Sequence, residues 1–256
     1  MIESITTSDE NLNPPDYGIV VMLDALGVSN YRIDETISFI QKRNELIQWL
    51  ESFENLQVSK VPDLPRVKIA TFGDTIIFTW ATGKNNVTKM LPNIGEWVRT
   101  TIRWGVANEI LLRGSISIGE YIADGTTVLG PAIADAAAWY EAAEWFGVIL
   151  TPKSQLYCIS LIERSRNNEN PNNVSFEDYF VNYPVPLKTG PKNLWAISWP
   201  YDFFNLQDDK MSALEVLSTA LWYFPMPKGT ESKYENSIAF FNWYGTDIYP
   251  KLKQKK

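Results

Sequence analysis

The feature that most constrains the fold is an unbroken apolar run, GIVVML over residues 18–23, which ends at Asp24. Alternating apolar and polar residues are typical of a strand with one face in water, whereas a continuous apolar run is typical of a strand buried on both faces. The sheet that contains this strand must therefore be covered on both sides. The run predicts a layered protein in which helices pack on a sheet.

Periodicity and turn residues predict the other elements. A helix is expected over 34–53, and a β-hairpin over 67–71 and 75–80. Further along, we expect a helix over 87–106, a strand over 110–118, a helix over 132–145, a strand over 148–151, a helix over 153–163, a strand over 194–199 and helices over 212–222 and 233–244. The order up to residue 163 is β-α-β-β-α-β-α-β, which predicts an α+β fold with a mixed sheet.

Three regions differ in composition. Residues 1–16 are polar and predict a flexible lead-in. Residues 17–163 hold the regular pattern of strands and helices and predict one domain. Residues 164–256 begin with an asparagine-rich stretch and predict a C-terminal extension packed on that domain.

The composition excludes several kinds of chemistry. The chain has 256 residues, no histidine and one cysteine, Cys158. The absence of histidine rules out Ser-His and Cys-His nucleophile pairs, HExxH zinc sites and imidazole base catalysis. A single cysteine forms no internal disulfide, which fits a reducing compartment. Any bound metal must therefore take oxygen ligands, which favours Mg²⁺, Mn²⁺ or Ca²⁺.

Charge and hydropathy bear on partners and location. A formal net charge of −7 argues against a broad surface for nucleic acid or for an anionic membrane. Residues 1–4 have neither a basic nor an apolar character, and no run approaches the roughly 18 apolar residues of a spanning helix. We therefore expect a cytoplasmic protein without a nucleic-acid or membrane partner.

Two aspartates, Asp24 and Asp74, each lie at the polar end of an apolar strand. A carboxylate in such a place costs free energy unless it is solvated, paired or bound to a cation. Because the β-α-β-β order allows the two strands to lie side by side, we expect both carboxylates at one edge of the sheet, within reach of one metal ion. The alternative is that both are turn residues, a role that aspartate often takes.

Four segments resemble, in order, the motifs of class III nucleotidyl cyclases. LDALGVS at 23–29 resembles the first-strand motif F-x-D-[IL]-x-G-F-[ST], and FGD at 72–74 resembles the Gly-Asp of the following hairpin. RGSISIGE at 113–120 resembles the next core strand, which carries G-I-x-x-G in that family. VLGPAI at 128–133 resembles the start of the helix that faces the partner subunit. The resemblance covers about residues 17–155.

The resemblance implies a ferredoxin-like β-α-β-β-α-β core that converts a nucleoside triphosphate to a cyclic nucleotide and pyrophosphate. Asp24 and Asp74 would be the catalytic carboxylates and would bind two divalent ions, Mg²⁺ or Mn²⁺, with the Ala25 carbonyl as a further ligand. A homodimer through the helix at 131–145 would be the working form.

The same resemblance implies the nucleotide-binding residues. The loop after the first strand, Ala25, Leu26, Gly27 and Val28, would bring backbone amides to the phosphates, with Gly27 allowing close approach. Arg113 is a candidate for pairing with phosphate, although a strand-end arginine can equally lie in solvent or in a surface pair. Glu120 is a candidate for a third carboxylate near the metals, and the alternative is an ordinary surface position.

The sequence departs from the family pattern at four positions. Ala70 and Thr127 stand where the family has the purine-selecting lysine and its partner residue, so a pyrimidine nucleotide, as in bacterial antiphage cyclases, is one interpretation. Lys68 lies on the same face of the strand as Ala70. Ala134 and Ala138 stand where active members have an asparagine and an arginine that act on the partner's site. Loss of one such charge-stabilising donor can cost roughly 10²–10³ in rate.

Three functions remain open on the sequence alone. The first is a nucleotidyl cyclase that makes a cyclic nucleotide, with antiphage signalling as its biological setting. The second is a pseudocyclase that binds nucleotide without turnover and passes the signal to residues 164–256. The third is an interaction module whose carboxylates are only turn residues.

Overall fold

The computed structural model describes residues 14–28, 31–60, 65–124, 127–167, 176–206, 210–222, 224, 226 and 228–254. The predicted lead-in falls largely on residues 1–13, outside the described residues, and Asp16 already belongs to the first strand. No helix of the described ranges is both long and apolar enough to cross a membrane.

One mixed sheet of eight strands organises the described chain, and the predicted α+β class is confirmed. Its strands are β1 (Asp16–Ala25), β2 (Lys68–Phe72), β3 (Thr75–Trp80), β4 (Leu112–Asp124), β5 (Thr127–Leu129), β6 (Gly147–Leu150), β7 (Phe180–Val185) and β8 (Lys192–Ile197). The order is β2-β3-β1-β4-β6-β8-β7, and β5 pairs with β4 beside this path. The β4–β6 pair is parallel and the other described pairs are antiparallel.

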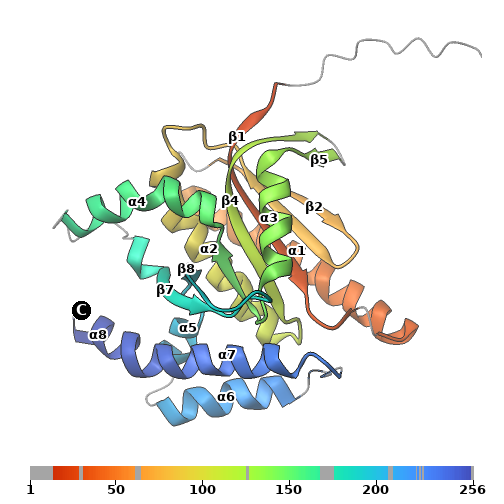
Figure 1. Cartoon of the computed structure of the whole chain (residues 1–256). Helices are drawn as coiled ribbons and strands as arrows, with labels where there is room; N and C mark the ends of the chain where they lie inside the picture. Colours follow the sequence, from red (N-terminus) through yellow and green to blue (C-terminus); the bar gives the residue numbers. More distant parts are fainter. Residues whose placement is uncertain are drawn as a thin grey trace, which may run out of the picture.

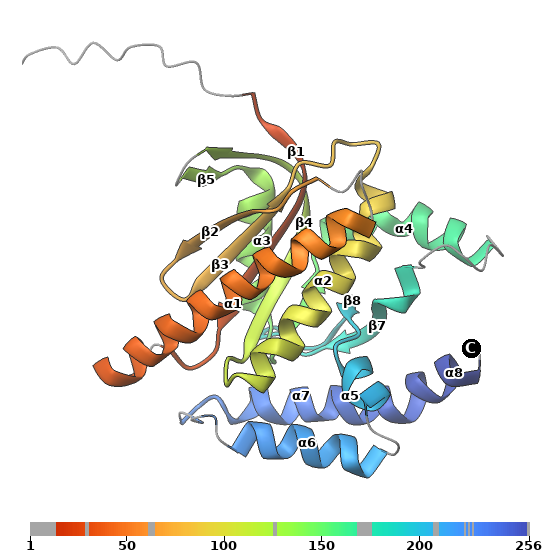
Figure 2. The same ribbon diagram turned by 180° about the vertical axis from the view of Figure 1, so that it is seen from behind.

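Helices cover both faces of the sheet. They are α1 (Ile33–Lys60), α2 (Val87–Ala107), α3 (Pro131–Ala142), α4 (Pro152–Asn167), α5 (Pro200–Leu206), α6 (Lys210–Trp222), α7 (Glu231–Trp243) and α8 (Tyr249–Gln254), with a π-helical turn at Tyr244–Ile248. In Figure 1, α3 lies in front of the sheet and α6 and α7 lie beneath it. Figure 2, from behind, shows α1 and α2 on the opposite face.

The strand order β2-β3-β1-β4, with α1 and α2 on one face, is the split β-α-β-β-α-β arrangement of a ferredoxin-like core, as predicted. Side chains of β1 alternate between two layers. Ile19, Val21 and Leu23 belong to the large core that includes α1 and α2, whereas Val20 and Met22 pack in a smaller cluster with α3. Burial on both sides explains the unbroken apolar run in the sequence.

Two predicted boundaries are wrong for tertiary reasons. The helix expected over 132–145 ends at Ala142, because Ala143 forms a bridge with Leu187 and Trp145 turns into the core against Tyr183. The strand expected over 110–118 runs instead from Leu112 to Asp124, where its last residues pair with β5.

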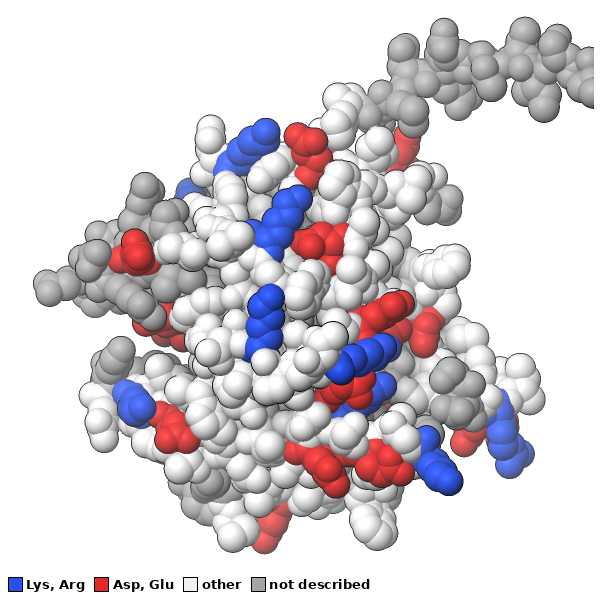
Figure 3. Space-filling model, viewed as in Figure 1, with Lys and Arg blue, Asp and Glu red and all other residues white. Residues whose placement is uncertain are grey.

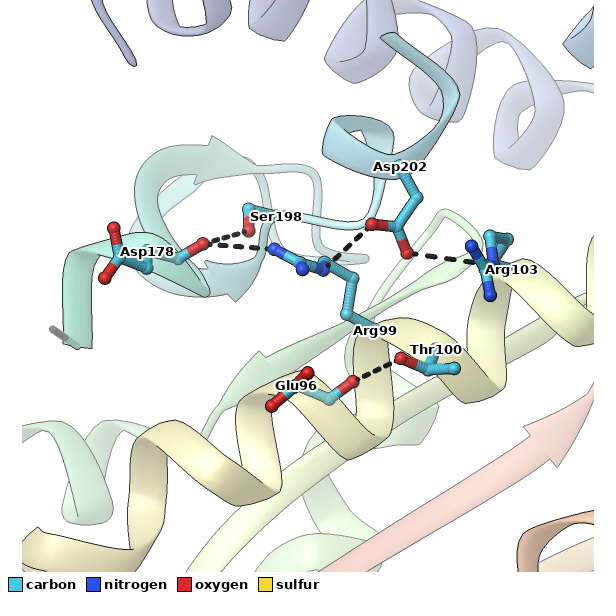
Figure 4. Close-up of polar contacts among 7 residues, drawn as sticks. All are labelled: Glu96, Arg99, Thr100, Arg103, Asp178, Ser198 and Asp202. Atoms are coloured by element: carbon cyan, nitrogen blue, oxygen red, sulfur yellow. Dashed lines mark hydrogen bonds and ion pairs between the residues drawn. The ribbon is translucent and has the colours of Figure 1, made fainter. Parts of the chain in front are cut away.

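Residues after 164 add two strands to the same sheet. Strand β8 pairs with β6, and β7 pairs with β8 at the sheet edge. An ion-pair cluster then joins this segment to α2, as Figure 4 shows. Arg99 on α2 lies 3.3 Å from Asp202 on α5, and its guanidinium lies 4.6 Å from the ring centres of both Tyr179 and Tyr201.

Candidate functional site

The candidate site begins with Asp24 near the end of β1, the central strand of the ferredoxin-like core. Its register partners are Thr75 on β3 and Arg113 on β4, so Asp24 is flanked on both sides. The residue is 7% exposed. Because side chains alternate along a strand, Asp24 shares the α3 face with Val20 and Met22.

The two oxygens of the Asp24 carboxylate have different partners. Arg113 donates to Oδ2 from Nε at 2.9 Å, and its terminal nitrogen lies 2.9 Å from the same oxygen. Thr75 Oγ1 donates to Oδ1 at 3.4 Å, longer than the usual hydroxyl hydrogen bond. The Arg113 guanidinium also lies 5.6 Å from the ring centre of Tyr140 on α3. One oxygen is therefore committed to Arg113, while the other is held only weakly.

Burial raises the pKa of Asp24 above its ordinary value of 3.8. The Arg113 charge and hydrogen bond lower the pKa and offset part of the rise, and the Asp74 charge raises it further. The net direction is upward because the desolvation of a buried carboxylate outweighs its single cationic partner. A further cation beside Asp24 would offset this desolvation and favour the charged carboxylate.

Asp74 lies in the turn of the β2–β3 hairpin, as the sequence predicts. The loop has two residues, with Gly73 first at a φ of 61°, the position at which a type II′ turn requires glycine. Arg43 on α1 donates to the Gly73 carbonyl at 2.6 Å and fixes the turn. Asp74 lines a hollow of about 490 Å³ between the hairpin and α1, together with Val28. Because Thr75 follows Asp74 directly and pairs with Asp24, both aspartates lie at one end of the sheet.

The loop after β1 matches the expected phosphate-binding role only in part. Ala25 is buried and pairs with Leu112 on β4. The Leu26 amide donates to the Leu111 carbonyl at 2.9 Å, so this amide is already bonded. Gly27 has a φ of 87°, a conformation that favours glycine.

Ala70, a predicted nucleotide-binding residue, lines a second hollow, of about 320 Å³, near the other end of β2. Lys68 and Asp124 are its charged residues. Lys68 Nζ donates to the Ala123 carbonyl at 3.0 Å, while Thr127 is exposed and is the register partner of Asp124. The sequence pointed to Lys68 but gave no signal for Asp124, because its position depends on how β4 folds back onto β5.

Glu120 does not join the site, and its candidacy as a third carboxylate is wrong. It lies seven residues beyond Arg113 on β4, opposite Tyr17 at the start of β1. Seven residues of strand span roughly 23 Å. Its carboxylate lies 3.9 Å from Lys84 Nζ in an exposed pair.

The two family-departure positions on α3 lie on its outer face. Ala134 and Ala138 are both exposed, one turn apart. The inner face is bound to β4, where Ser115 Oγ donates to the Ala136 carbonyl at 2.6 Å and Ser117 Oγ donates to the Ala132 carbonyl at 2.5 Å. The outer face of α3 around these two alanines is therefore exposed to solvent.

The donor set suits a hard divalent cation. Asp24 Oδ1, the Asp74 carboxylate and the Ala25 carbonyl are oxygen donors of the kind that Mg²⁺ and Mn²⁺ prefer. Within the described ranges, no three acidic, histidine or cysteine residues group closely enough to hold a metal by themselves. A metal here would therefore depend on water or phosphate oxygens for its remaining ligands, which is usual for Mg²⁺ bound with a nucleotide.

Comparisons with known proteins give a fold-level likeness only. No protein-family model matches the chain, and no curated protein matches it. Among solved structures, one similar to this chain is the catalytic core of a rhodopsin-guanylyl cyclase with converted specificity, in complex with ATPαS, at 13% identity over 72% of this chain and 96% of that one, with a TM-score of 0.44. Another is a bacterial light-regulated adenylyl cyclase, at 12% identity over 81% of this chain and 100% of that one, with a TM-score of 0.40.

Proposed function

We propose that this protein binds a nucleoside triphosphate with divalent metal at Asp24 and Asp74 and converts it to a 3′,5′-cyclic nucleotide and pyrophosphate. The observation that carries the proposal is that Asp24 and Asp74 lie at the same end of the sheet, on β1 and in the turn that leads into its neighbour β3. The sequence motifs around both residues and the ferredoxin-like strand order support the same reading.

Each residue has a defined task in this proposal. Asp24 and Asp74 hold two divalent ions, Mg²⁺ or Mn²⁺, with the Ala25 carbonyl. When bound, such ions neutralise phosphate charge and lower the pKa of the attacking 3′-hydroxyl. Arg113 holds the Asp24 carboxylate in place through Oδ2 and leaves Oδ1 for the metal. Its planar guanidinium has further donors that can meet a phosphate oxygen.

The hollow beside Ala70 is the proposed place for the nucleobase. Its volume of about 320 Å³ is in the range of small ligand sites, and Lys68 and Asp124 offer one donor and one acceptor for base edges. A pyrimidine base, with an antiphage signalling role, is the interpretation that the resemblance suggests, because Ala70 stands where the family has its purine-selecting lysine. This part of the proposal rests on the sequence resemblance.

A homodimer through α3 completes the proposal. The exposed Ala134 and Ala138 leave a smooth outer face that allows another backbone to approach closely. Light scattering coupled to gel filtration should give a dimer, and Ala134→Arg with Ala138→Glu should shift it toward monomer. An unchanged dimer in that double variant would place the interface elsewhere.

The decisive experiment incubates the purified protein with each of ATP, GTP, CTP and UTP plus Mn²⁺ and detects cyclic product and pyrophosphate by mass spectrometry. Asp24→Asn and Asp74→Asn should each abolish product, while Glu120→Gln, a matched acidic change on β4, should retain it. Product that survives both aspartate changes would disprove the assigned site.

A pseudocyclase is the second candidate, and two observations favour it. Ala134 and Ala138 provide no ribose or phosphate donor, and the Leu26 amide is already bonded to Leu111. Under this alternative, Mn²⁺ with nucleotide raises the melting temperature, the shift needs Asp24, and every triphosphate stays intact. If neither a melting shift nor a cyclic product is observed, the interaction module is the function that remains.

A further inference from the structure

The first turns of α7 are fixed against the connection between α3 and β6. Asn236 Nδ2 donates to the Glu144 carbonyl at 2.7 Å, and the Phe146 amide donates to Ser237 Oγ at 2.9 Å. Ser237 also donates to the Lys233 carbonyl, one turn earlier, at 2.6 Å. These side-chain hydrogen bonds to the backbone hold the first turns of α7 in place. The position of Lys233 is therefore fixed by the fold.

This contact brings the C-terminal segment to the end of the sheet that holds Asp24. Gly147, next to Phe146, is the register partner of Arg113, whose side chain binds Asp24. Lys188 arrives from the other side of the same connection, where its amide donates to the Ala142 carbonyl at 3.0 Å. Figure 3 shows basic and acidic side chains gathered on this face, where α3 approaches α7 in Figure 1.

The charges in this group act on one another. Burial lowers the pKa of Lys233, and the Arg113 charge lowers it further. Glu144 raises the pKa, Lys188 lowers it and Asp24 raises it. Neither lysine ammonium is within 4.0 Å of a carboxylate in the described part of the chain, so both are available to an incoming anion. A polyanion bound here would interact favourably with all three cations.

From this arrangement we infer that Lys188 and Lys233 of the C-terminal segment join Arg113 to bind the polyphosphate of the nucleotide beside Asp24. The inference rests on the proposed function and assigns the segment after residue 164 a direct part in it. Positive charge that the family takes from a partner's helix, and that Ala134 and Ala138 lack, would come here from the same chain.

The chemistry of the place suits a polyphosphate. Lysine ammonium groups act as mobile point charges that follow phosphate oxygens, and arginine adds a planar pair of donors. Lys233 lies in the first turns of α7, a helix of 13 residues, where the helix dipole also favours an anion. Asp24 and Asp74, the carboxylates beside this group, would hold the metal cations that accompany the polyphosphate.

The test uses the full chain and two probes. The first is inorganic tripolyphosphate without divalent metal, and the second is a nucleoside triphosphate with Mn²⁺; both are titrated by calorimetry. Lys233→Met and Lys188→Met should each weaken both probes about tenfold or more, since each removes a charge-assisted contact. Lys233→Arg should restore most of the affinity. Lys251→Met, on α8 of the same segment, is the matched control and should bind both probes as the unaltered protein does.

The outcomes separate this inference from the proposed function. If Asp24→Asn removes Mn²⁺-nucleotide binding while both lysine variants bind normally, the inference fails and the proposed function stands. If tripolyphosphate binding needs the lysines but Mn²⁺-nucleotide never binds, the anion site stands and the proposed function fails. Lys188 is exposed, so Lys188→Met decides the matter even if Lys233→Met does not fold.

Discussion

Two arginine–aspartate pairs lie in different parts of the molecule and have different surroundings. Arg99 and Asp202 join α2 to α5, with side chains 11% and 12% exposed, and two tyrosine rings enclose the arginine. Arg113 and Asp24 join β4 to β1, with side chains 15% and 10% exposed, and a second carboxylate acts on the aspartate. Burial is nearly equal, so burial alone does not separate them.

The partners of each carboxylate separate the two pairs. Asp202 uses both oxygens, with Arg99 at 3.3 Å from Oδ1 and Arg103 at 3.9 Å from Oδ2 (Figure 4). Asp24 has both Arg113 contacts on one oxygen and a long hydroxyl contact on the other. A carboxylate between two cations is suited to holding elements together, whereas one with a weakly held oxygen beside another acid is suited to taking up a cation.

Breaking the Arg99–Asp202 pair should have the largest effect on stability. Asp202→Asn should lower the free energy of unfolding by about 3–5 kcal/mol, because it leaves the Arg99 guanidinium buried without a carboxylate. Urea unfolding at neutral pH measures this change. Arg99 also donates from a terminal nitrogen to the Asp178 carbonyl at 3.2 Å. A loss below about 1 kcal/mol would show that this carbonyl and the tyrosine rings satisfy Arg99 without the ion pair.

The same substitution at the other pair should instead remove ligand binding. Asp24→Asn should eliminate the stabilisation that Mn²⁺ with nucleoside triphosphate gives, about 2.7 kcal/mol at a ligand concentration of 100 Kd. Melting curves with and without ligand provide the measurement, with Asp202→Asn as the control that lowers both curves but keeps the difference. A ligand shift that persists without the Asp24 carboxylate would place the metal elsewhere.

Acid titration should sharpen the comparison further. An acid whose pKa is raised on folding binds protons more tightly in the folded state, so its contribution to stability is full below 3.8 and is lost as pH rises from 3.8 through the raised pKa. The stability of the unaltered protein relative to Asp24→Asn should therefore be greatest below pH 3.8 and decline above it. Urea midpoints of both proteins across this range test the sign, and a relative stability that rises with pH would mean that Arg113 dominates over burial.

A surface pair should show the smallest effect. Glu120→Gln breaks the exposed contact with Lys84 at 3.9 Å and should change the free energy of unfolding by about 0.5 kcal/mol or less. The Mn²⁺-nucleotide melting shift should be unchanged, because Glu120 lies at the other end of β4 from Asp24. Loss of that shift in Glu120→Gln would show that Glu120 takes part in the site.

The parts of the site that local sequence encodes could be predicted. Asp24 and Asp74 each adjoin an apolar run, and the residues around Gly73 predict a two-residue turn. The order of the elements therefore predicted that both aspartates lie at one edge of the sheet. The Arg113–Asp24 bond did not follow, because it depends on the antiparallel register of two strands 89 residues apart. From the sequence, Arg113 could either pair with phosphate or lie in solvent. In the structure its side chain binds the Asp24 carboxylate.

The parts that depend on tertiary packing were missed. Strand β7 contains Pro184, which reads as a strand breaker but is tolerated at the sheet edge where β7 lies. Lys188 and Lys233 carry no local signal, since their positions depend on hydrogen bonds between the α3–β6 connection and the C-terminal segment. Such placements are set by contacts of the whole fold and not by periodicity.

The register of the central strand also has a consequence for synthesis of the protein. β1 contains a continuous buried apolar run, and its pairing with β4 joins residues 89 apart, as Asp24 and Arg113 show. At a translation rate of about 5–20 residues per second, β1 waits on the order of 5–20 s for this partner. During that interval a strand destined for burial on both faces is without one of its neighbours. The nascent chain is therefore expected to be a client of ribosome-associated chaperones until β4 has emerged.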